Sequence, residues 1–155
     1  MAKRRAKAPP STAVSAGVRY IESSALVAAL LEHDSDALRS VRARGRRVTS
    51  ALTIAQTARA ILRARAAARL TADEERAAVR ALHRFERRCY LAGVTDEVLA
   101  RVRRPFPVEP IRTLDAVHLA TTELLGEPPP LVVVVTRDVR VRENARALGY
   151  TVESR

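Results

Sequence analysis

Four polar residues stand where the pattern of the chain predicts that strands end or helices begin: Glu22, Gln56, Asp115 and Asp138. Glu22 ends the segment VRYIE, and Asp138 lies two residues after the run LVVVVT. Gln56 and Asp115 each fall in the first turn of an expected helix. Because ligands bind outside the carboxyl ends of the strands in open α/β sheets, we expect these four side chains to converge.

The three carboxylates in this set, Glu22, Asp115 and Asp138, would repel one another unless a cation neutralised them. Ligands that are all oxygen atoms favour a hard ion such as Mg²⁺ or Mn²⁺. Such an ion can hold a phosphodiester oxygen, lower the pKa of a bound water and stabilise charge on the leaving oxygen. The residues therefore indicate metal-assisted phosphodiester hydrolysis, with the three carboxylates as metal ligands.

Each of the four residues also has a local structural explanation. An acid such as Asp115 is favoured in the first turn of a helix by the helix dipole. Asp138 can cap the helix behind it, and Gln56 can form a capping box with Thr53. Glu22 can be a surface acid at a strand end. Spacing alone leaves these explanations open beside the metal site.

Three further residues have weaker claims to a functional role. His118 follows Asp115 by three residues on one helix face, but its apolar surroundings (LDAVHLAT) favour a packed core histidine over a metal ligand. Arg59 and Arg63 share a helix face that is either simply solvated or a track for RNA. The sequence contains no Cys–His metal spacing, glycine-rich phosphate loop or nucleophile elbow.

Strands and helices are expected to alternate along the chain. The expected strands are 18–22, 47–50, 89–94, 131–136 and 150–153. The expected helices are 25–31, 36–43, 53–70, 71–88, 96–103, 113–125 and 139–148. This alternation predicts a three-layer α/β/α fold around a parallel central sheet. The unbroken β-branched run in Leu131–Thr136 predicts a central strand that is buried on both faces.

The 155 residues fit one domain, and the net charge of +11 favours a polyanion or an acidic protein as partner. Lys occurs only at positions 3 and 7 while Arg and Ala are abundant, so a compositional bias explains the charge equally well. Residues 1–17 carry four cations and no acid, and we expect a disordered basic tail before a domain at 18–155.

One cysteine, Cys89, precludes an intrachain disulfide and suits a reducing, cytoplasmic location. The longest apolar stretch, Ala25–Leu31, is too short to span a bilayer, so no membrane association is expected.

Four segments resemble the motifs of PIN-domain ribonucleases, in order and with suitable spacing between Val18 and Val152. They are RYIESSALVAALL, TSALTIAQTARAIL, IRTLDAVHLATTELLG and LVVVVTRDVRVRENARALGYTV. The group that these segments resemble best is the VapC-type toxins of bacterial toxin–antitoxin pairs. The resemblance implies a PIN-like fold and a Mg²⁺-dependent endoribonuclease, usually a homodimer, that is held inactive by an antitoxin protein encoded beside it.

The resemblance also implies an acidic site at Glu22, Gln56, Asp115 and Asp138, lined by Ser24 and Thr136. Two of these positions depart from the family pattern, which has Asp where this chain has Glu22 and Glu where it has Gln56. The first interpretation is therefore a toxin-type ribonuclease whose activity these two departures attenuate. The alternative is a degenerate PIN domain that binds RNA or a protein partner without catalysis. A small DNA-binding or structural partner protein is a third interpretation, disfavoured because no DNA-reading motif is present.

Overall fold

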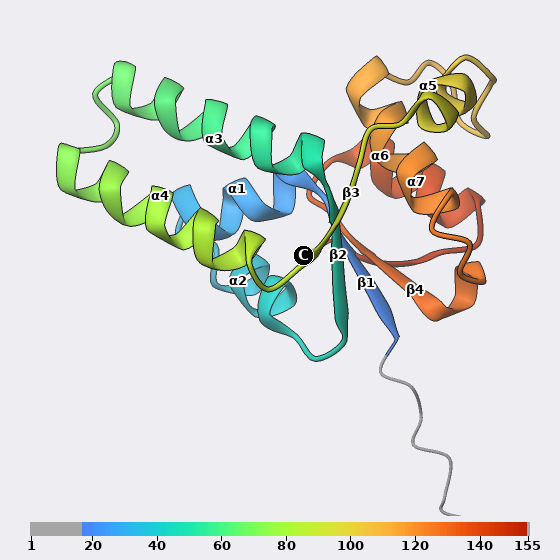
Figure 1. Cartoon of the computed structure of the whole chain (residues 1–155), viewed down its shortest axis with the longest axis horizontal. Helices are drawn as coiled ribbons and strands as arrows, with labels where there is room; N and C mark the ends of the chain where they lie inside the picture. Colours follow the sequence, from blue (N-terminus) through green and yellow to red (C-terminus); the bar gives the residue numbers. More distant parts are fainter. Residues whose placement is uncertain (1–16, 155) are drawn as a thin grey trace, which may run out of the picture.

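The computed structural model describes residues 17–154, which form a five-stranded sheet between two groups of helices (Figure 1). The strands are β1 (Val18–Ile21), β2 (Arg46–Ser50), β3 (Tyr90–Ala92), β4 (Val132–Val135) and β5 (Thr151–Glu153). Their order is β3-β2-β1-β4-β5, and all four pairings are parallel. The predicted three-layer α/β/α fold with a parallel sheet is confirmed. The basic tail predicted at 1–17 lies, apart from Gly17, outside the described residues.

Helices α1 to α4 cover one face of the sheet and helices α5 to α7 cover the other (Figure 1). Their bounds are α1 (Ser23–Leu31), α2 (Ser35–Arg42), α3 (Ala51–Ala66), α4 (Ala72–Glu86), α5 (Asp96–Val102), α6 (Thr113–Glu123) and α7 (Val139–Ala147). Within residues 17–154, none of these helices has the length and apolar character needed to cross a membrane.

The apolar strand β4 is an interior strand, because it pairs with β1 on one side and β5 on the other. The middle position of the sheet belongs to β1. β4 is also two residues shorter than the predicted 131–136, since Pro129–Leu131 forms a 3-10 turn before it. The interior position follows from its apolar side chains, which supply core to both faces.

Alternation along β1 divides the core into two clusters. Val18 and Tyr20 pack against α5, α6 and α7, whereas Ile21 packs against α1, α3 and α4. Arg19 is only 6% exposed, and its guanidinium donates to both carboxylate oxygens of Glu153 at 2.9 and 2.6 Å. The middle strand therefore carries one buried charge with an opposite partner at the end of β5.

The carboxyl ends of β1, β2 and β4 lead directly into α1, α3 and α7, so three helix starts share one edge of the sheet. Ser50 caps α3, since its hydroxyl accepts the amide of Leu52 at 3.1 Å. The predicted capping box between Thr53 and Gln56 is therefore wrong: Thr53 is fully buried two residues into the helix and faces the carbonyl of Ile21.

Candidate active site

Glu22 lies directly after β1 and caps α1, accepting the amide of Ser24 at 3.0 Å. Ser23 Oγ donates to the same carboxylate oxygen at 2.6 Å. The hydroxyls of Thr136, at 2.8 Å, and of Ser24 donate to the other oxygen. The side chain is only 3% exposed, so the alternative of a surface acid at a strand end is wrong. Four donors hold this buried carboxylate in one orientation.

Ser24 and Thr136 connect Glu22 to the loop between β4 and α7. The Ser24 hydroxyl accepts the amides of Arg137 at 2.8 Å and Asp138 at 3.0 Å. Thr136 Oγ1 accepts the Asp138 amide as well, also at 3.0 Å. These bonds fix the first turn of α1 against the start of α7, although the two segments are more than 100 residues apart in sequence.

Asp138 is the N-cap of α7, because one carboxylate oxygen accepts the amides of Arg140 at 2.8 Å and Val141 at 3.1 Å. The capping explanation for Asp138 is thus confirmed. It does not exclude a second role, since the carboxylate also lies near enough to Asp115 to raise the pKa of that residue.

Asp115 lies in the first turn of α6, and its carboxyl group has a raised pKa. Burial raises its pKa to about 6, and the negative charges of Asp138 and Glu22 add to the effect, while Arg112 and Arg140 oppose it. Its Oδ2 atom is buried and has no hydrogen-bond partner within the described part of the chain. A buried carboxylate oxygen without a partner, beside two other carboxylates, is a place where a cation would be favourable.

Gln56 reaches from α3 to His118 on α6, with 2.7 Å between Gln56 Oε1 and His118 Nε2. The other ring nitrogen, Nδ1, lies 2.9 Å from the hydroxyl of Tyr20 on β1. His118 is 1% exposed, and burial lowers its pKa, so the ring is neutral. The prediction of a packed core histidine is confirmed, but this histidine also contacts the site, since its Nε2 lies 3.7 Å from Glu22 Oε1.

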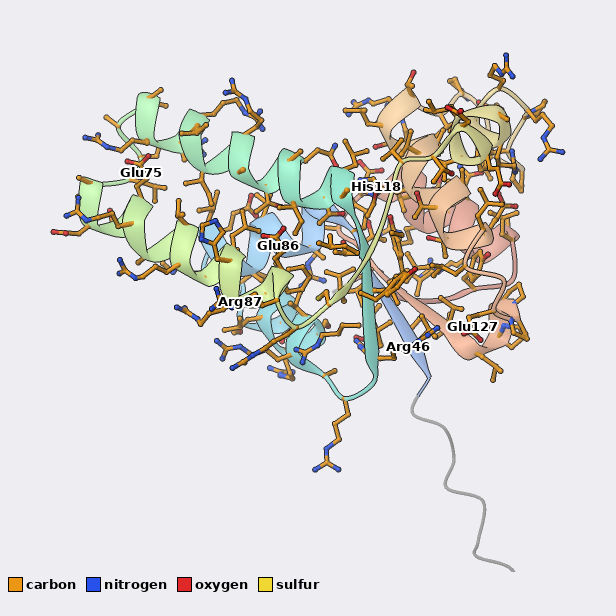
Figure 2. All side chains as sticks on the ribbon, viewed as in Figure 1. Arg46, Glu75, Glu86, Arg87, His118 and Glu127 are labelled. Carbon is orange, nitrogen blue, oxygen red and sulfur yellow. The ribbon has the colours of Figure 1, made fainter. Side chains whose placement is uncertain are left out.

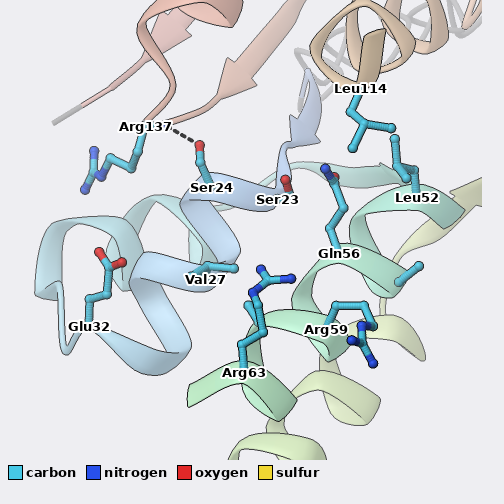
Figure 3. A pocket seen from close by; sticks show the side chains of 12 residues that line it. Ser23, Ser24, Val27, Glu32, Leu52, Gln56, Arg59, Arg63, Leu114 and Arg137 are labelled. Carbon is cyan, nitrogen blue, oxygen red and sulfur yellow. Dashed lines mark hydrogen bonds between the residues drawn. The ribbon is translucent and has the colours of Figure 1, made fainter. Parts of the chain in front are cut away.

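A groove of about 580 Å³ opens beside these residues, between α1, α3 and α6 (Figure 3). Apolar side chains form much of its wall, and Gln56 points into it from α3 (Figure 3). Residues that line it include Ser24, Val27, Gln56, Arg59, Arg63 and Leu114. The groove therefore joins the polar cluster at the strand ends to a basic face of α3.

The donor set fits a hard cation in part. Within residues 17–154, no three Asp, Glu, His or Cys side chains are arranged closely enough to hold a metal ion by themselves. The Glu22 oxygens accept hydrogen bonds from the hydroxyls of Ser23 and Thr136, and the prediction that Glu22 is a direct metal ligand stays a prediction. Asp115 and Asp138 remain, and Mg²⁺ is commonly fixed by one or two carboxylates with water in its other positions.

The family model described as PIN domain matches residues 19–147. The chain belongs to the PIN domain family. Two curated relatives from Mycobacterium tuberculosis are similar over most of their length. Ribonuclease VapC35 is 37% identical over 141 residues, which cover 86% of this chain and 93% of the relative. Ribonuclease VapC46 is 41% identical over 135 residues, covering 86% and 94%.

Solved PIN-type structures share the fold at low sequence identity. The structure titled as VapBC2 from Rickettsia felis, bound to a DNA fragment from its promoter, aligns with a TM-score of 0.61 and 12% identity. It covers 89% of this chain and 98% of the other. VapBC-1 from nontypeable Haemophilus influenzae aligns with a TM-score of 0.56 and 13% identity, covering 88% and 97%. These likenesses support the PIN fold.

For this PIN domain, sequence reasoning found the four motif residues and missed two features of their surroundings. The four donors around Glu22 were only partly foreseen, because Ser23 was not singled out. The contact between His118 and Gln56 was missed entirely. The spacing of His118 from Asp115 placed both on one helix face, which was the available signal, but it did not reveal that α3 would lie opposite.

Proposed function

We propose that the chain is a metal-dependent endoribonuclease of toxin type, which hydrolyses RNA phosphodiesters with Mg²⁺ or Mn²⁺. The observation that carries this proposal is made at Asp115. Burial and the negative charges of Asp138 and Glu22 raise its pKa, and its buried Oδ2 has no hydrogen-bond partner within residues 17–154. The ribonuclease names of two relatives at 37% and 41% identity support it.

In this proposal Asp115 and Asp138 would hold the ion, which would supply positive charge to a phosphodiester oxygen and acidity to a bound water. Glu22 adds negative potential at Asp115 and is oriented by Ser23, Ser24 and Thr136. Because those hydroxyls already occupy its oxygens, we assign Glu22 an electrostatic and positioning role. The sequence interpretation made it a direct ligand.

Gln56 is the second departure from the family pattern, and it contributes no charge. A neutral amide is a poorer partner for a cation than a carboxylate. We therefore expect weaker metal affinity, and slower cleavage at low Mg²⁺, than in a PIN domain with Glu at this position. The altered residue does not remove the two carboxylates assigned to the ion.

For partners, we propose a protein antitoxin that inhibits the enzyme, a homodimeric state and a cytoplasmic location. The two structural neighbours, VapBC2 and VapBC-1, support the antitoxin partner. The single cysteine, Cys89, agrees with a reducing compartment because it has no partner for an intrachain disulfide.

The experiment that tests the proposal is incubation of purified protein with total RNA, in Mg²⁺ or Mn²⁺ and in EDTA. We expect discrete cleavage products that require the metal and that Asp115→Asn abolishes. If the protein binds RNA but never cleaves it with either metal, the chain is the alternative considered above, a degenerate PIN domain.

A further inference from the structure

His118 fixes which end of the Gln56 amide faces the groove. Gln56 Oε1 can only accept and lies 2.7 Å from His118 Nε2, so the Tyr20 hydroxyl, 2.9 Å from Nδ1, donates to that nitrogen. A neutral ring that accepts at Nδ1 carries its hydrogen on Nε2. The Glu22 carboxylate, 3.7 Å from Nε2, favours the same tautomer. The Nε2 hydrogen is therefore donated to Gln56 Oε1 over 2.7 Å.

Because its oxygen is engaged by His118, the Gln56 amide presents its NH₂ group to the groove. That nitrogen has no hydrogen-bond partner within residues 17–154, and the side chain lines the groove next to Ser23 and Ser24 (Figure 3). A glutamate held by the same histidine would present an oxygen, which can only accept. The departure at this position thus changes the hydrogen-bonding character of the site as well as its charge.

Two arginines continue the same face of α3. Arg59 and Arg63 follow Gln56 at the i+3 and i+7 positions, and all three line the groove. Neither arginine forms an ion pair with an acid of the described chain. From Gln56 to Arg63 the helix rises by about 10 Å. Within residues 17–154 the groove therefore has a row of three unpaired donors, and Leu114 and Arg137, the sequence neighbours of Asp115 and Asp138, line the same groove.

We propose that this row binds the backbone of single-stranded RNA, with Gln56 donating to a phosphate oxygen next to the carboxylates and with His118 as its positioning residue. A phosphodiester chain presents anionic oxygens at regular intervals, which matches donors spaced along a helix. The proposal rests on the proposed function only in taking RNA as the ligand. It gives Gln56 a role in substrate binding. This role is separate from the weaker interaction of a neutral amide with a metal ion.

The test is fluorescence anisotropy of a labelled single-stranded RNA 12-mer of mixed sequence, measured in EDTA so that neither metal binding nor cleavage contributes. Gln56→Met, nearly equal in size, should weaken binding about tenfold, since a hydrogen bond to a charged group is lost. Gln56→Glu should weaken it further. Because Gln56 is neutral, the Gln56→Met variant should keep the wild-type dependence on salt.

The arginines should behave differently. Arg59→Ala and Arg63→Ala should each reduce the slope of log affinity against log salt by about 0.7, as expected for one phosphate contact on a single strand. Arg80, exposed on α4 and outside the groove, supplies the matched control. Arg80→Ala should leave the slope unchanged; an equal reduction would mean that general charge, and no defined row, binds the RNA.

Two variants of His118 distinguish a role in positioning Gln56 from a purely structural role. His118→Gln retains a donor near the Nε2 position and should keep RNA affinity within about twofold of wild type. His118→Asn retains a group near Nδ1 for Tyr20 but loses the donor to Gln56, so affinity should fall toward that of Gln56→Met. Thermal melting of both variants measures the purely structural cost, which should be similar for the two.

The proposal is overturned if Gln56→Met binds RNA like wild type, if wild type does not bind RNA in EDTA, or if both His118 variants retain full affinity. It is also overturned if an oligoglutamate peptide competes for the groove as well as RNA of equal charge does. These outcomes are separate from the proposed nuclease function. Metal-dependent cleavage together with RNA binding that does not depend on Gln56 would refute only the proposed RNA-binding row. Gln56-dependent RNA binding without cleavage would refute only the proposed nuclease function.

Discussion

The middle strand β1 and the residue after it carry two buried charges, three residues apart, in opposite electrostatic situations. Arg19 lies against a carboxylate. Its guanidinium donates to both oxygens of Glu153 and also to the carbonyl of Ser40 at 2.9 Å. Glu22 is surrounded by hydroxyl donors, and its negative charge helps to raise the pKa of Asp115, a group of the same sign.

The difference indicates which buried charge serves the fold and which serves function. The cluster of Arg19, Glu153 and the Ser40 carbonyl (the Arg19 cluster) is neutralised by the protein itself. Arg19 holds the pKa of Glu153 below its usual range. The cluster around Asp115 is left incomplete, because burial and repulsion raise the pKa of Asp115 and its Oδ2 has no hydrogen-bond partner in the described part of the chain. A protein that keeps such an arrangement loses stability unless a ligand completes it.

A surface pair shows how ordinary charges differ from both clusters. Arg46 and Glu127 meet at 2.7 Å near the amino ends of the strands (Figure 2), with side chains 57% and 35% exposed. Water screens such a pair, and its contribution to stability is small. Burial is therefore what gives the Arg19 and Asp115 clusters their importance.

The largest expected effect comes from removing the charge of Asp115. Asp115→Asn keeps the shape of the side chain but removes one of the two carboxylates that we assign to the ion. We expect the rate of RNA cleavage in Mg²⁺ to fall by at least about a hundredfold. Single-turnover cleavage measures this, with Asp96→Asn, on the remote helix α5, as the control. Retention of more than a tenth of the activity would contradict the assignment.

A mutation in the Arg19–Glu153 ion pair should lower the stability of the fold and leave metal binding unchanged. Glu153→Gln should lower the free energy of unfolding at pH 7 by about 1 kcal/mol, a value discounted because Glu153 is 39% exposed. The folded-state pKa of Glu153 lies below the ordinary 4.5. Its contribution is therefore present above that value and is lost as pH falls through the folded pKa.

Urea denaturation of wild type and Glu153→Gln at several pH values measures this prediction. The two proteins should differ at pH 7 and converge in acid. A difference that grows toward low pH would have the wrong sign and would remove the ion pair from the explanation of stability. Mg²⁺ should change the free energy of unfolding of both proteins by the same amount, because the mutation lies outside the proposed metal site.

A smaller effect is expected from Gln56→Glu, which restores the charge typical of the family. Mg²⁺ affinity should rise severalfold, because a carboxylate adds negative potential beside Asp115. Cleavage should increase at limiting Mg²⁺ and saturating RNA, whereas KM for RNA should increase because a donor has become an acceptor. Calorimetric titration and steady-state kinetics separate the two changes. Equal Mg²⁺ affinity in both proteins would show that Gln56 does not limit metal binding.

Most of the fold could be predicted from local patterns, because strands, helix starts and capping residues depend on neighbours in sequence. The run before Thr136 identified an interior strand, and Thr71 forms a capping box with Glu74 at the start of α4, where a helix was expected from residue 71. The start of α3 was placed two residues late, because Thr53 and Gln56 have the spacing of a capping box. Their side chains are instead engaged by distant partners, Ile21 and His118.

The candidate site could be predicted as a set of residues but not as a set of contacts. Strand ends and helix starts located Glu22, Asp115 and Asp138 at one edge of the sheet. Which oxygen is satisfied and which is left without a partner depends on hydroxyls more than 100 residues away in sequence. That distinction, which separates Glu22 from Asp115, required the packed structure.

The central claim is that the cluster around Asp115 is electrostatically incomplete without a cation. The most direct measurement is thermal melting of wild type and Asp115→Asn at pH 7, in EDTA and in excess Mg²⁺. The folded-state pKa of Asp115, about 6, lies above its ordinary 3.8, so the folded state loses stability as pH rises through about 6. In EDTA the variant should therefore melt higher than wild type by about 3 °C, and only wild type should gain from Mg²⁺. A variant that melts lower in EDTA, or an equal gain from Mg²⁺ in both proteins, would contradict the account.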